Sequence, residues 1–265
     1  MTLIDNLKTI WNSISFGTKF VLFISIICYL IDYYYEEYYY TLFVNIPKKT
    51  ILQYQFWRIL IPQFFHGNIQ NLAISLLGFL YFAIQTEKKF GSVQFFVDIF
   101  IKNLIIQIIF VAFCFGFSYL DEEMLIANSF GFWNLSFIYQ MRRALNDDDE
   151  TQKFLCFSLN FQQKYLPALF FLIMNFIVFP RLDLVGATIF SFVENQFFDG
   201  FSFRLSSAFQ KKCENSFPFK FVSSRLDFFN IEQVDESFDS KKGTSSVEFG
   251  IISTVETKPK QEKSN

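Results

Sequence analysis

The stretch Gln55–Ser92 reads QFWRILIPQFFHGNIQNLAISLLGFLYFAIQTEKKFGS and holds an apolar run with chain-turning residues on both sides. The run covers Asn71–Gln85 and can extend back to Asn68, which suits a helix N-cap. Gly91 suits the turn that follows. We therefore expect one apolar helix here. The residues expected to stabilise it and its flanks are Trp57, Arg58, His66, Gly67, Asn68, Glu87, Gly91 and Ser92.

Five other apolar runs lie in the first 200 residues. An apolar run of about 18 or more residues with few charges is a candidate spanning helix. The runs are Phe20–Tyr35, Asn103–Leu120, Met124–Met141, Leu166–Pro180 and Leu184–Phe198. Asp98 and Lys102, four apart before the third run, can pair on a helix inside a bilayer. A soluble core could hold one or two such runs, but six indicate an all-α integral membrane bundle.

Composition excludes several classes of function. The chain has 265 residues with 23 Lys+Arg and 25 Asp+Glu, a net charge of −2, so no basic surplus favours nucleic acid. The single histidine argues against most metal clusters, and the four cysteines form no C-x-x-C pair. No phosphate-binding, dinucleotide-binding or metalloprotease motif occurs. We expect neither a metal nor a cofactor.

Charge divides the chain near residue 200. Residues 1–200 carry 29 charged residues, whereas the much shorter segment 201–265 carries 19. We expect a membrane domain over 1–200 and a polar tail over 201–265. Residues 235–265 resemble a disordered segment. The Phe-rich part, 201–230, either lies along the membrane surface, binds a partner, or reflects biased codon usage in a flexible tail.

Basic residues in the loops predict the orientation. With six spans and an inside N-terminus, eight Lys and Arg before the tail fall inside and four fall outside. The loop Asp121–Glu123, which falls outside, is purely acidic. Both termini are therefore predicted to face the cytosol, or the matrix if the membrane is mitochondrial.

The stretch quoted first also carries a family pattern. Its parts are the Trp57-Arg58 pair, the His66-Gly67-Asn68 turn, and Glu87 followed by Gly91-Ser92. This pattern resembles the rhomboid superfamily over about residues 15–200, most closely over 55–92. The resemblance implies a six-helix membrane bundle with cytosolic termini. The short sequence Lys164–Pro167 is also similar to a pattern in derlins, which are rhomboid-like pseudoproteases.

The residues that active rhomboids need are absent from the matching positions. The resemblance implies a serine in Gly-x-Ser-Gly on the fourth helix and a histidine on the sixth. Here Trp133 and Asn134 match the serine and the glycine after it, and Asp183 matches the histidine. The histidine and asparagine that help form the oxyanion site match Asn71 and Ser75.

A serine hydroxyl acts as a nucleophile only when a neighbouring base accepts its proton. Ser129 or Ser136 could act as a displaced nucleophile only with Asp183 or Glu194 as base, whereas Asp183 is expected to pair with Arg181 or with a polar group near the outer surface. We therefore expect a protein that is not an enzyme.

The resemblance implies a pseudoprotease that binds transmembrane segments or partner membrane proteins, in quality control or trafficking. Its expected partners are membrane lipids and client helices, and the endoplasmic reticulum is the expected location. The alternative is a structural accessory subunit of a multi-subunit complex, for example in the mitochondrial inner membrane. A third possibility is an active protease with a displaced serine and base.

Overall fold

Helices make up nearly all of the regular structure. The computed structural model describes residues 11–146, 151–153, 160–177, 181–198, 203–225 and 227–231. The principal helices are α2 (Phe16–Tyr34), α4 (Ile69–Phe90), α5 (Ser92–Phe117), α6 (Trp133–Asn146), α7 (Leu166–Ile177) and α8 (Leu182–Phe198). The other elements are α3 (Tyr38–Phe43), η1 (Lys48–Leu52), η2 (Phe56–Ile59), η3 (Pro62–Phe64), η4 (Glu122–Ile126), β1 (Thr151–Lys153), β2 (Asn160–Gln162), η5 (Gln163–Tyr165), α9 (Ser207–Glu214) and η6 (Phe219–Phe221). Strands β1 and β2 pair antiparallel.

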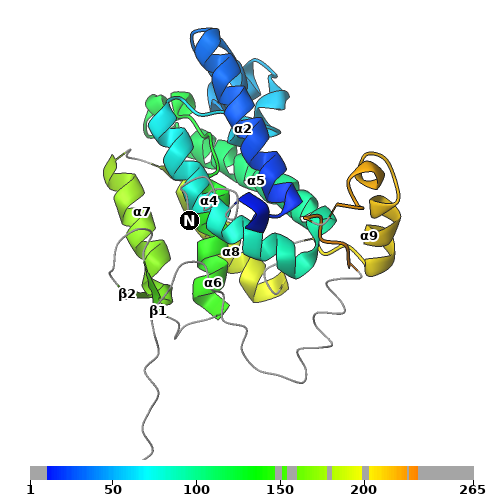
Figure 1. The fold of residues 1–265 in the computed structure, drawn as a ribbon. Coiled ribbons are helices and arrows are strands. Elements are labelled where there is room, and N and C mark those ends of the chain that lie inside the picture. Colours follow the sequence, from blue (N-terminus) through cyan, green and yellow to red (C-terminus); the bar gives the residue numbers. More distant parts are fainter. Residues whose placement is uncertain are drawn as a thin grey trace, which may run out of the picture.

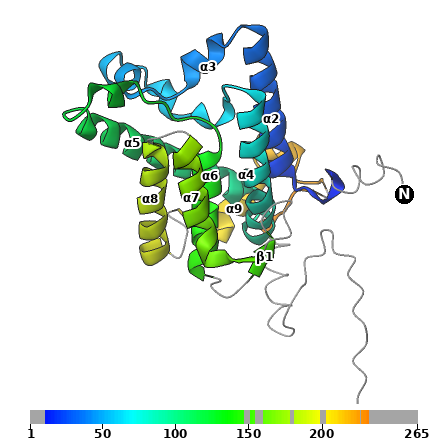
Figure 2. The same ribbon diagram turned by 90° about the vertical axis from the view of Figure 1, so that its left-hand side faces the viewer.

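The bundle is built around α6. This helix packs against α8, α4, α7 and α5, while α2 packs against α4 (Figures 1 and 2). Phenylalanine fills much of the interior: Phe79, Phe95, Phe132 and Phe137 are almost fully buried. The rings of Phe79 and Phe132 lie 4.5 Å apart between centroids, a distance at which aromatic pairs stabilise a core. Part of the Phe excess in the sequence is therefore structural.

Three of the described helices are long and apolar enough to cross a membrane, namely α2, α4 and α5. The predicted runs coincide with these helices and with α7 and α8, although residues 178–180 of the fifth run lie outside the described residues. α6, α7 and α8 are shorter. The chain is therefore a helical bundle with three candidate spans, and six crossings remain a prediction.

Two of the predicted runs start at different residues from the corresponding helices. The fourth run was placed at Met124–Met141, but its first residues form η4 and a loop, and α6 begins only at Trp133. The loop is held away from a helix because Ser129 pairs through its backbone with Asn45. The third run starts at Asn103, but the helix that contains it begins at Ser92, directly after the turn expected at Gly91. Its first turns carry charge that the bundle neutralises.

That neutralisation involves a buried ion cluster. Lys102 Nζ lies 3.1 Å from Asp98 Oδ2 and 3.2 Å from Glu194 Oε2 of α8. Tyr139 of α6 donates a hydrogen bond of 2.9 Å to Asp98 Oδ2. All four side chains are at most 3% exposed. The predicted Asp98–Lys102 pair is confirmed, and it joins α5 to α6 and α8.

The boundaries of α4 follow the sequence prediction. Asn68 Oδ1 accepts a hydrogen bond of 2.7 Å from the Asn71 backbone N–H, which makes Asn68 the N-cap. At the other end Gly91 has φ 87°, a conformation that side chains with a Cβ rarely adopt. The turn at Gly91 sends the chain directly into α5.

Residues 203–231, where described, fold back onto the bundle. Helix α9 contacts α5 and η6, and it lies beside the first turns of α2 and α5 in Figure 1. The segment of the tail predicted to be disordered, 235–265, lies outside the described residues.

Candidate functional site

The positions that match the catalytic residues of rhomboids gather at the start of α6 and of α8. Trp133 is 3% exposed, and its ring lies 6.1 Å from that of Phe170 on α7. Asn134 donates from Nδ2 to Ser129 Oγ over 3.2 Å. The hydroxyl of Ser129 in turn donates to Asp183 Oδ2 over 3.2 Å. Two of the three predicted positions, Asn134 and Asp183, are thus joined through Ser129.

Asp183 is paired with a cation inside the bundle, as predicted. Arg181 donates from Nε to Asp183 Oδ1 over 2.9 Å and from Nη2 to Oδ2 over 2.7 Å. The backbone N–H of Leu184 donates to Oδ1 as well, over 3.0 Å. The bidentate guanidinium therefore engages both oxygens of the Asp183 carboxylate.

The hydroxyl of Ser129 is fully engaged. It accepts hydrogen bonds from Gln107 Nε2 at 3.0 Å and from Asn134, and it is 0% exposed. A nucleophile must contact its substrate, and hydrolysis also needs a water molecule. The geometry thus places a buried serine beside a carboxylate that is already paired with Arg181.

The network continues into the loop after α3. Asn45 donates to Gln107 Oε1 over 2.7 Å and accepts from Thr50 Oγ1 over 2.8 Å. Asn45 and Ser129 also exchange two backbone hydrogen bonds, of 3.2 and 3.0 Å. We call the set Asn45, Thr50, Gln107, Ser129, Asn134, Arg181 and Asp183 the interior polar network. Asn45, Thr50 and Gln107 were not singled out from the sequence, because no short motif contains them.

Asn71, Ser75 and His66 lie on a different side of the α6 start. Ser75 Oγ is 3.3 Å from His66 Nε2 and accepts a hydrogen bond of 2.8 Å from the Phe132 N–H. Ser75 and His66 are buried, whereas Asn71 is half-buried on the first turn of α4. Burial lowers the pKa of His66 to about 4, so the ring is neutral at pH 7.

Trp57 and Arg58 hold the first loop. Arg58 is 2% exposed and donates from Nη1 to the carbonyls of Thr41 at 2.8 Å and Val44 at 2.7 Å. Trp57, 42% exposed, donates from Nε1 to the Leu42 carbonyl over 3.3 Å. These carbonyls lie at the end of α3, directly before Asn45. The pair therefore positions the loop that completes the interior polar network.

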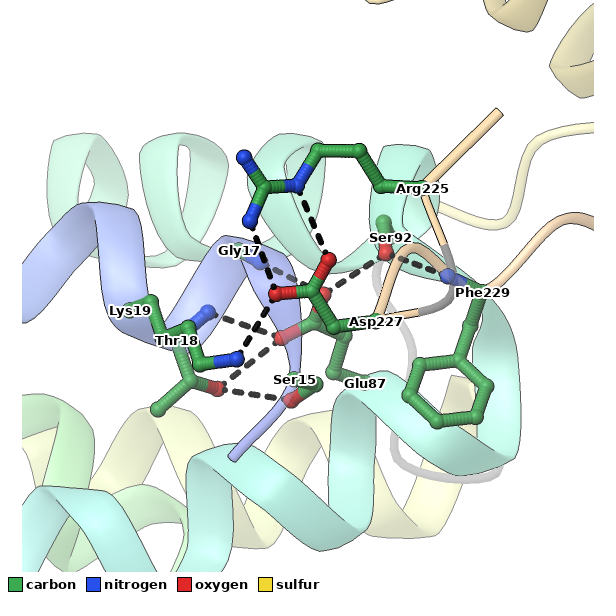
Figure 3. Close-up of polar contacts among 9 residues, drawn as sticks. All are labelled: Ser15, Gly17, Thr18, Lys19, Glu87, Ser92, Arg225, Asp227 and Phe229. Carbon is green, nitrogen blue, oxygen red and sulfur yellow. Dashed lines mark hydrogen bonds and ion pairs between the residues drawn. The ribbon is translucent and has the colours of Figure 1, made fainter. Parts of the chain in front are cut away.

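Glu87 forms a second polar centre at the other end of the bundle, shown in Figure 3. Its Oε1 accepts from the Gly17 N–H at 2.7 Å and from Ser92 Oγ at 2.6 Å. Its Oε2 accepts from the Thr18 N–H at 2.8 Å and from Thr18 Oγ1 at 2.9 Å. Glu87 thus occupies the N-terminus of α2, where a negative charge is stabilised by the helix dipole.

This contact requires close approach of α2. A Cβ at Gly17 would lie 2.9 Å from Glu87 Oε1 and 2.9 Å from the Phe95 ring, closer than side chains tolerate. Ser15, whose Oγ lies 3.2 Å from Thr18 Oγ1, borders the same centre. Glu87 reaches the first amides of α2 because α2 begins against the end of α4.

The tail is fastened beside Glu87. Ser92 and Phe229 exchange two hydrogen bonds: the Ser92 N–H donates to the Phe229 carbonyl at 2.9 Å, and the Phe229 N–H donates to Ser92 Oγ at 3.0 Å. Asp227 Oδ2 lies 2.7 Å from Lys19 Nζ, and Asp227 Oδ1 lies 3.0 Å from Arg225 Nε (Figure 3). The Phe16 N–H donates to the Asp227 carbonyl over 2.7 Å.

The charges around Asp227 favour its ionised form, paired with Lys19 and Arg225. Although burial raises the pKa of Asp227, hydrogen bonds from Arg225 and Lys19 outweigh it and hold that pKa below 3.8. Asp227 is therefore ionised at pH 7. Among the described residues there is no group of three or more His, Cys, Asp and Glu side chains that could hold a metal ion.

Three apolar helices of spanning length, with buried charges paired inside the bundle, are typical of an integral membrane protein. Comparison with known families agrees. The chain belongs to the family described as eukaryotic integral membrane protein (DUF1751), whose model matches residues 16–203. The match covers the bundle and ends where the described tail segment begins. No match was found among curated proteins.

Proposed function

We propose that this protein is a non-catalytic rhomboid-like membrane protein, a pseudoprotease that binds transmembrane segments or partner membrane proteins. Its role would lie in membrane-protein quality control or trafficking, with the endoplasmic reticulum as the favoured location. The observation that carries the proposal is the bidentate Arg181–Asp183 pair, which also engages Ser129. By the resemblance to rhomboids, Asp183 matches the position of the catalytic histidine.

The arrangement of α7 supports lateral binding. The principal contacts of α7 are with α6 and η5, and it lies at the edge of the bundle in Figure 1. Leu172 and Phe176 of α7 are 66% and 92% exposed, and Leu77 of α4 is 56% exposed. A helix held mainly by one neighbour can shift at little cost and admit another helix. The side of the bundle formed by α4 and α7 is thus the proposed client-binding face.

Polar residues behind this face would favour clients that carry polar groups. Four polar side chains could attract such a client: Ser75, Asn134 and Asp183 are buried and hydrogen-bonded, and Asn71 is half-buried. A polar side chain of a client would meet Asn71 first and reach the others only after α7 moves. In hydrocarbon such interhelical hydrogen bonds contribute about 0.6–2 kcal/mol each.

Bilayer thickness offers a second attraction. The described parts of α6, α7 and α8 are shorter than the usual spanning length, whereas α5 is longer. If all six helices cross, the short ones would thin the bilayer locally. A client helix that is itself short would then match the bilayer better beside this bundle than elsewhere.

Site-specific photocrosslinking in native membranes tests the client-binding face. A crosslinker at Leu77 or Phe176 should capture membrane proteins, and one at Phe100 of α5, also exposed, serves as the matched control. The proposal further expects Asn71→Leu with Asn134→Leu to reduce client co-purification. If the crosslinker at Phe100 captures as much as those at Leu77 and Phe176, and the two substitutions have no effect, the proposed client-binding face is ruled out.

The alternative is a structural accessory subunit, for example in the mitochondrial inner membrane. The observation in its favour is that residues 203–231 fold into a defined unit with exposed Phe side chains, rather than remaining a plain linker. Native gel electrophoresis after mild solubilisation distinguishes the structural subunit from the client-binding pseudoprotease. A fixed large complex of constant composition favours the subunit, and a variable set of substoichiometric clients favours the pseudoprotease.

A further inference from the structure

The described tail, residues 203–225 and 227–231, has an apolar inner side. We call it the tail module. Phe228 is 0% exposed, and its ring lies 5.7 Å from Phe16 of α2 and 6.2 Å from Phe219. Phe219 in turn lies 5.7 Å from Phe96 of α5. These rings dock the module on the first turns of α2 and α5.

The outer side of the tail module is also apolar. Four of its phenylalanine side chains are at least half exposed, namely Phe203, Phe209, Phe217 and Phe221. Phe217 and Phe221 are 82% and 75% exposed, and their rings lie 6.0 Å apart. Adjacent exposed aromatic rings of this size mark an interaction site, because single exposed apolar residues are scattered on ordinary surfaces.

The exposed charges of the tail module are all positive. Its basic residues are Arg204, Lys211, Lys212, Lys220 and Arg225, and all of them are exposed. Its two acidic residues are turned to internal partners: Glu214 Oε1 accepts from the Ile231 N–H at 2.8 Å, and Asp227 is held by Lys19 and Arg225. The outer surface therefore combines exposed Phe with exposed Lys and Arg.

The position of the module is fixed relative to two candidate spans. Gln94 of α5 donates from Nε2 to the Phe203 carbonyl at 2.8 Å and accepts from the Leu205 N–H at 2.8 Å. The Ser92–Phe229 and Lys19–Asp227 contacts hold the other end (Figure 3). α2 and α5, two of the candidate spans, both start here, so a bilayer crossed by these helices would have its headgroups near the module.

We propose that the tail module binds the anionic lipid surface of the leaflet at this end of the bundle. Phe217 and Phe221 enter the boundary between headgroups and acyl chains, and Lys211, Lys212 and Lys220 contact acidic headgroups. Aromatic and apolar side chains combined with Lys and Arg are the composition of interfacial anchors. Anionic lipid is favoured over a protein partner because the surface lies at the start of two candidate spans and presents only positive exposed charge.

The test uses the full chain, reconstituted at one copy per nanodisc in phosphatidylcholine with or without phosphatidylserine. Phe217→Trp provides the probe, and lipids brominated near the headgroup quench a tryptophan that reaches them. The unsubstituted chain, which has 3 Trp, gives the background. We expect quenching of the introduced tryptophan, and stronger quenching when phosphatidylserine is present.

A matched pair of charge variants tests the electrostatic contribution. Lys211→Gln with Lys212→Gln removes two neighbouring lysines of the module, and Lys48→Gln with Lys49→Gln removes two neighbouring lysines of η1. Each lysine near an anionic surface changes the partition of a segment onto that surface about fivefold. The first pair should therefore weaken the partition of the tail module onto phosphatidylserine-containing lipid about 25-fold. The second pair should leave it unchanged.

The quenching experiment has one supporting outcome and two opposing ones. Quenching that rises with phosphatidylserine and falls only in the Lys211→Gln, Lys212→Gln variant supports the proposal, provided circular dichroism shows equal helix content in both variants. Absence of quenching in both lipids would overturn it and leave the surface to a protein partner. Quenching that is indifferent to lipid charge and to both variants would also overturn it, because the lysines would then have no part.

Discussion

Glu87→Gln replaces one carboxylate oxygen by an NH₂ group, and the structure predicts a large loss of stability from this small change. The carboxylate accepts four hydrogen bonds, two at each oxygen. A glutamine keeps one oxygen and places an NH₂ group against the donors of the other. The hydroxyl of Ser92 or Thr18 can rotate to accept from it, but the backbone N–H of Gly17 or Thr18 cannot.

The expected loss of stability in Glu87→Gln follows from these contacts. Hydrogen bonds to a charged group contribute about 1.5–3 kcal/mol each, and the change weakens two and leaves a buried donor unpaired. We therefore expect a loss of about 3 kcal/mol, and about 2–4 °C per kcal/mol in a domain of this size gives a fall in Tm of about 6–12 °C.

Thermal unfolding of the full chain in mild detergent measures this. Glu122→Gln is the control, because it makes the same chemical change at an exposed residue of η4. The control should change Tm by less than about 1 °C, since surface substitutions are usually within about 0.5 kcal/mol. If the two variants unfold at the same temperature, Glu87 is not the centre that joins α2, α4 and α5.

Three further predictions concern charge. Arg181→Gln leaves the buried carboxylate of Asp183 without its cation and should lower the free energy of unfolding by about 3–5 kcal/mol, measured by denaturant titration in detergent. His66 has a pKa near 4 in the folded chain against 6.5 ordinarily, so stability should fall as pH decreases from 6.5 toward 4. The loss should reach about 2 kcal/mol at about pH 5 and be absent in His66→Gln. Asp227 has a folded pKa below 3.8, so its contribution is present above that pH and lost as pH falls through the folded pKa. Proteolysis of the tail by an acid-tolerant protease should therefore stay slow down to about pH 5 and accelerate in more acidic buffer, while Lys19→Gln should accelerate it at neutral pH.

Features that depend on neighbours in sequence could be predicted. The N-cap at Asn68, the turn at Gly91 and the pairs Asp98–Lys102 and Arg181–Asp183 each involve residues at most four positions apart. Such contacts follow from helix periodicity and capping alone. The same reasoning located the apolar helices.

Contacts between distant segments could not be predicted. Glu87 binds helix amides 70 residues away, and Asn45 meets Ser129 through a backbone bridge that also delays the start of α6. Periodicity gives no information on which helix end meets which. The tail shows the same limit: its Phe residues could be recognised as unusual, but which of them face α2 and α5 depends on the docking of Asp227 and Phe229.

We propose that the interior polar network has replaced a catalytic pair. Labelling with a fluorophosphonate, which reacts with activated serines, tests it most directly. The full chain in native membranes should give no more labelling than its Ser129→Ala variant, alongside an active rhomboid protease as positive control. Labelling of the chain that disappears in Ser129→Ala would show an activated hydroxyl beside Asp183 and contradict the claim.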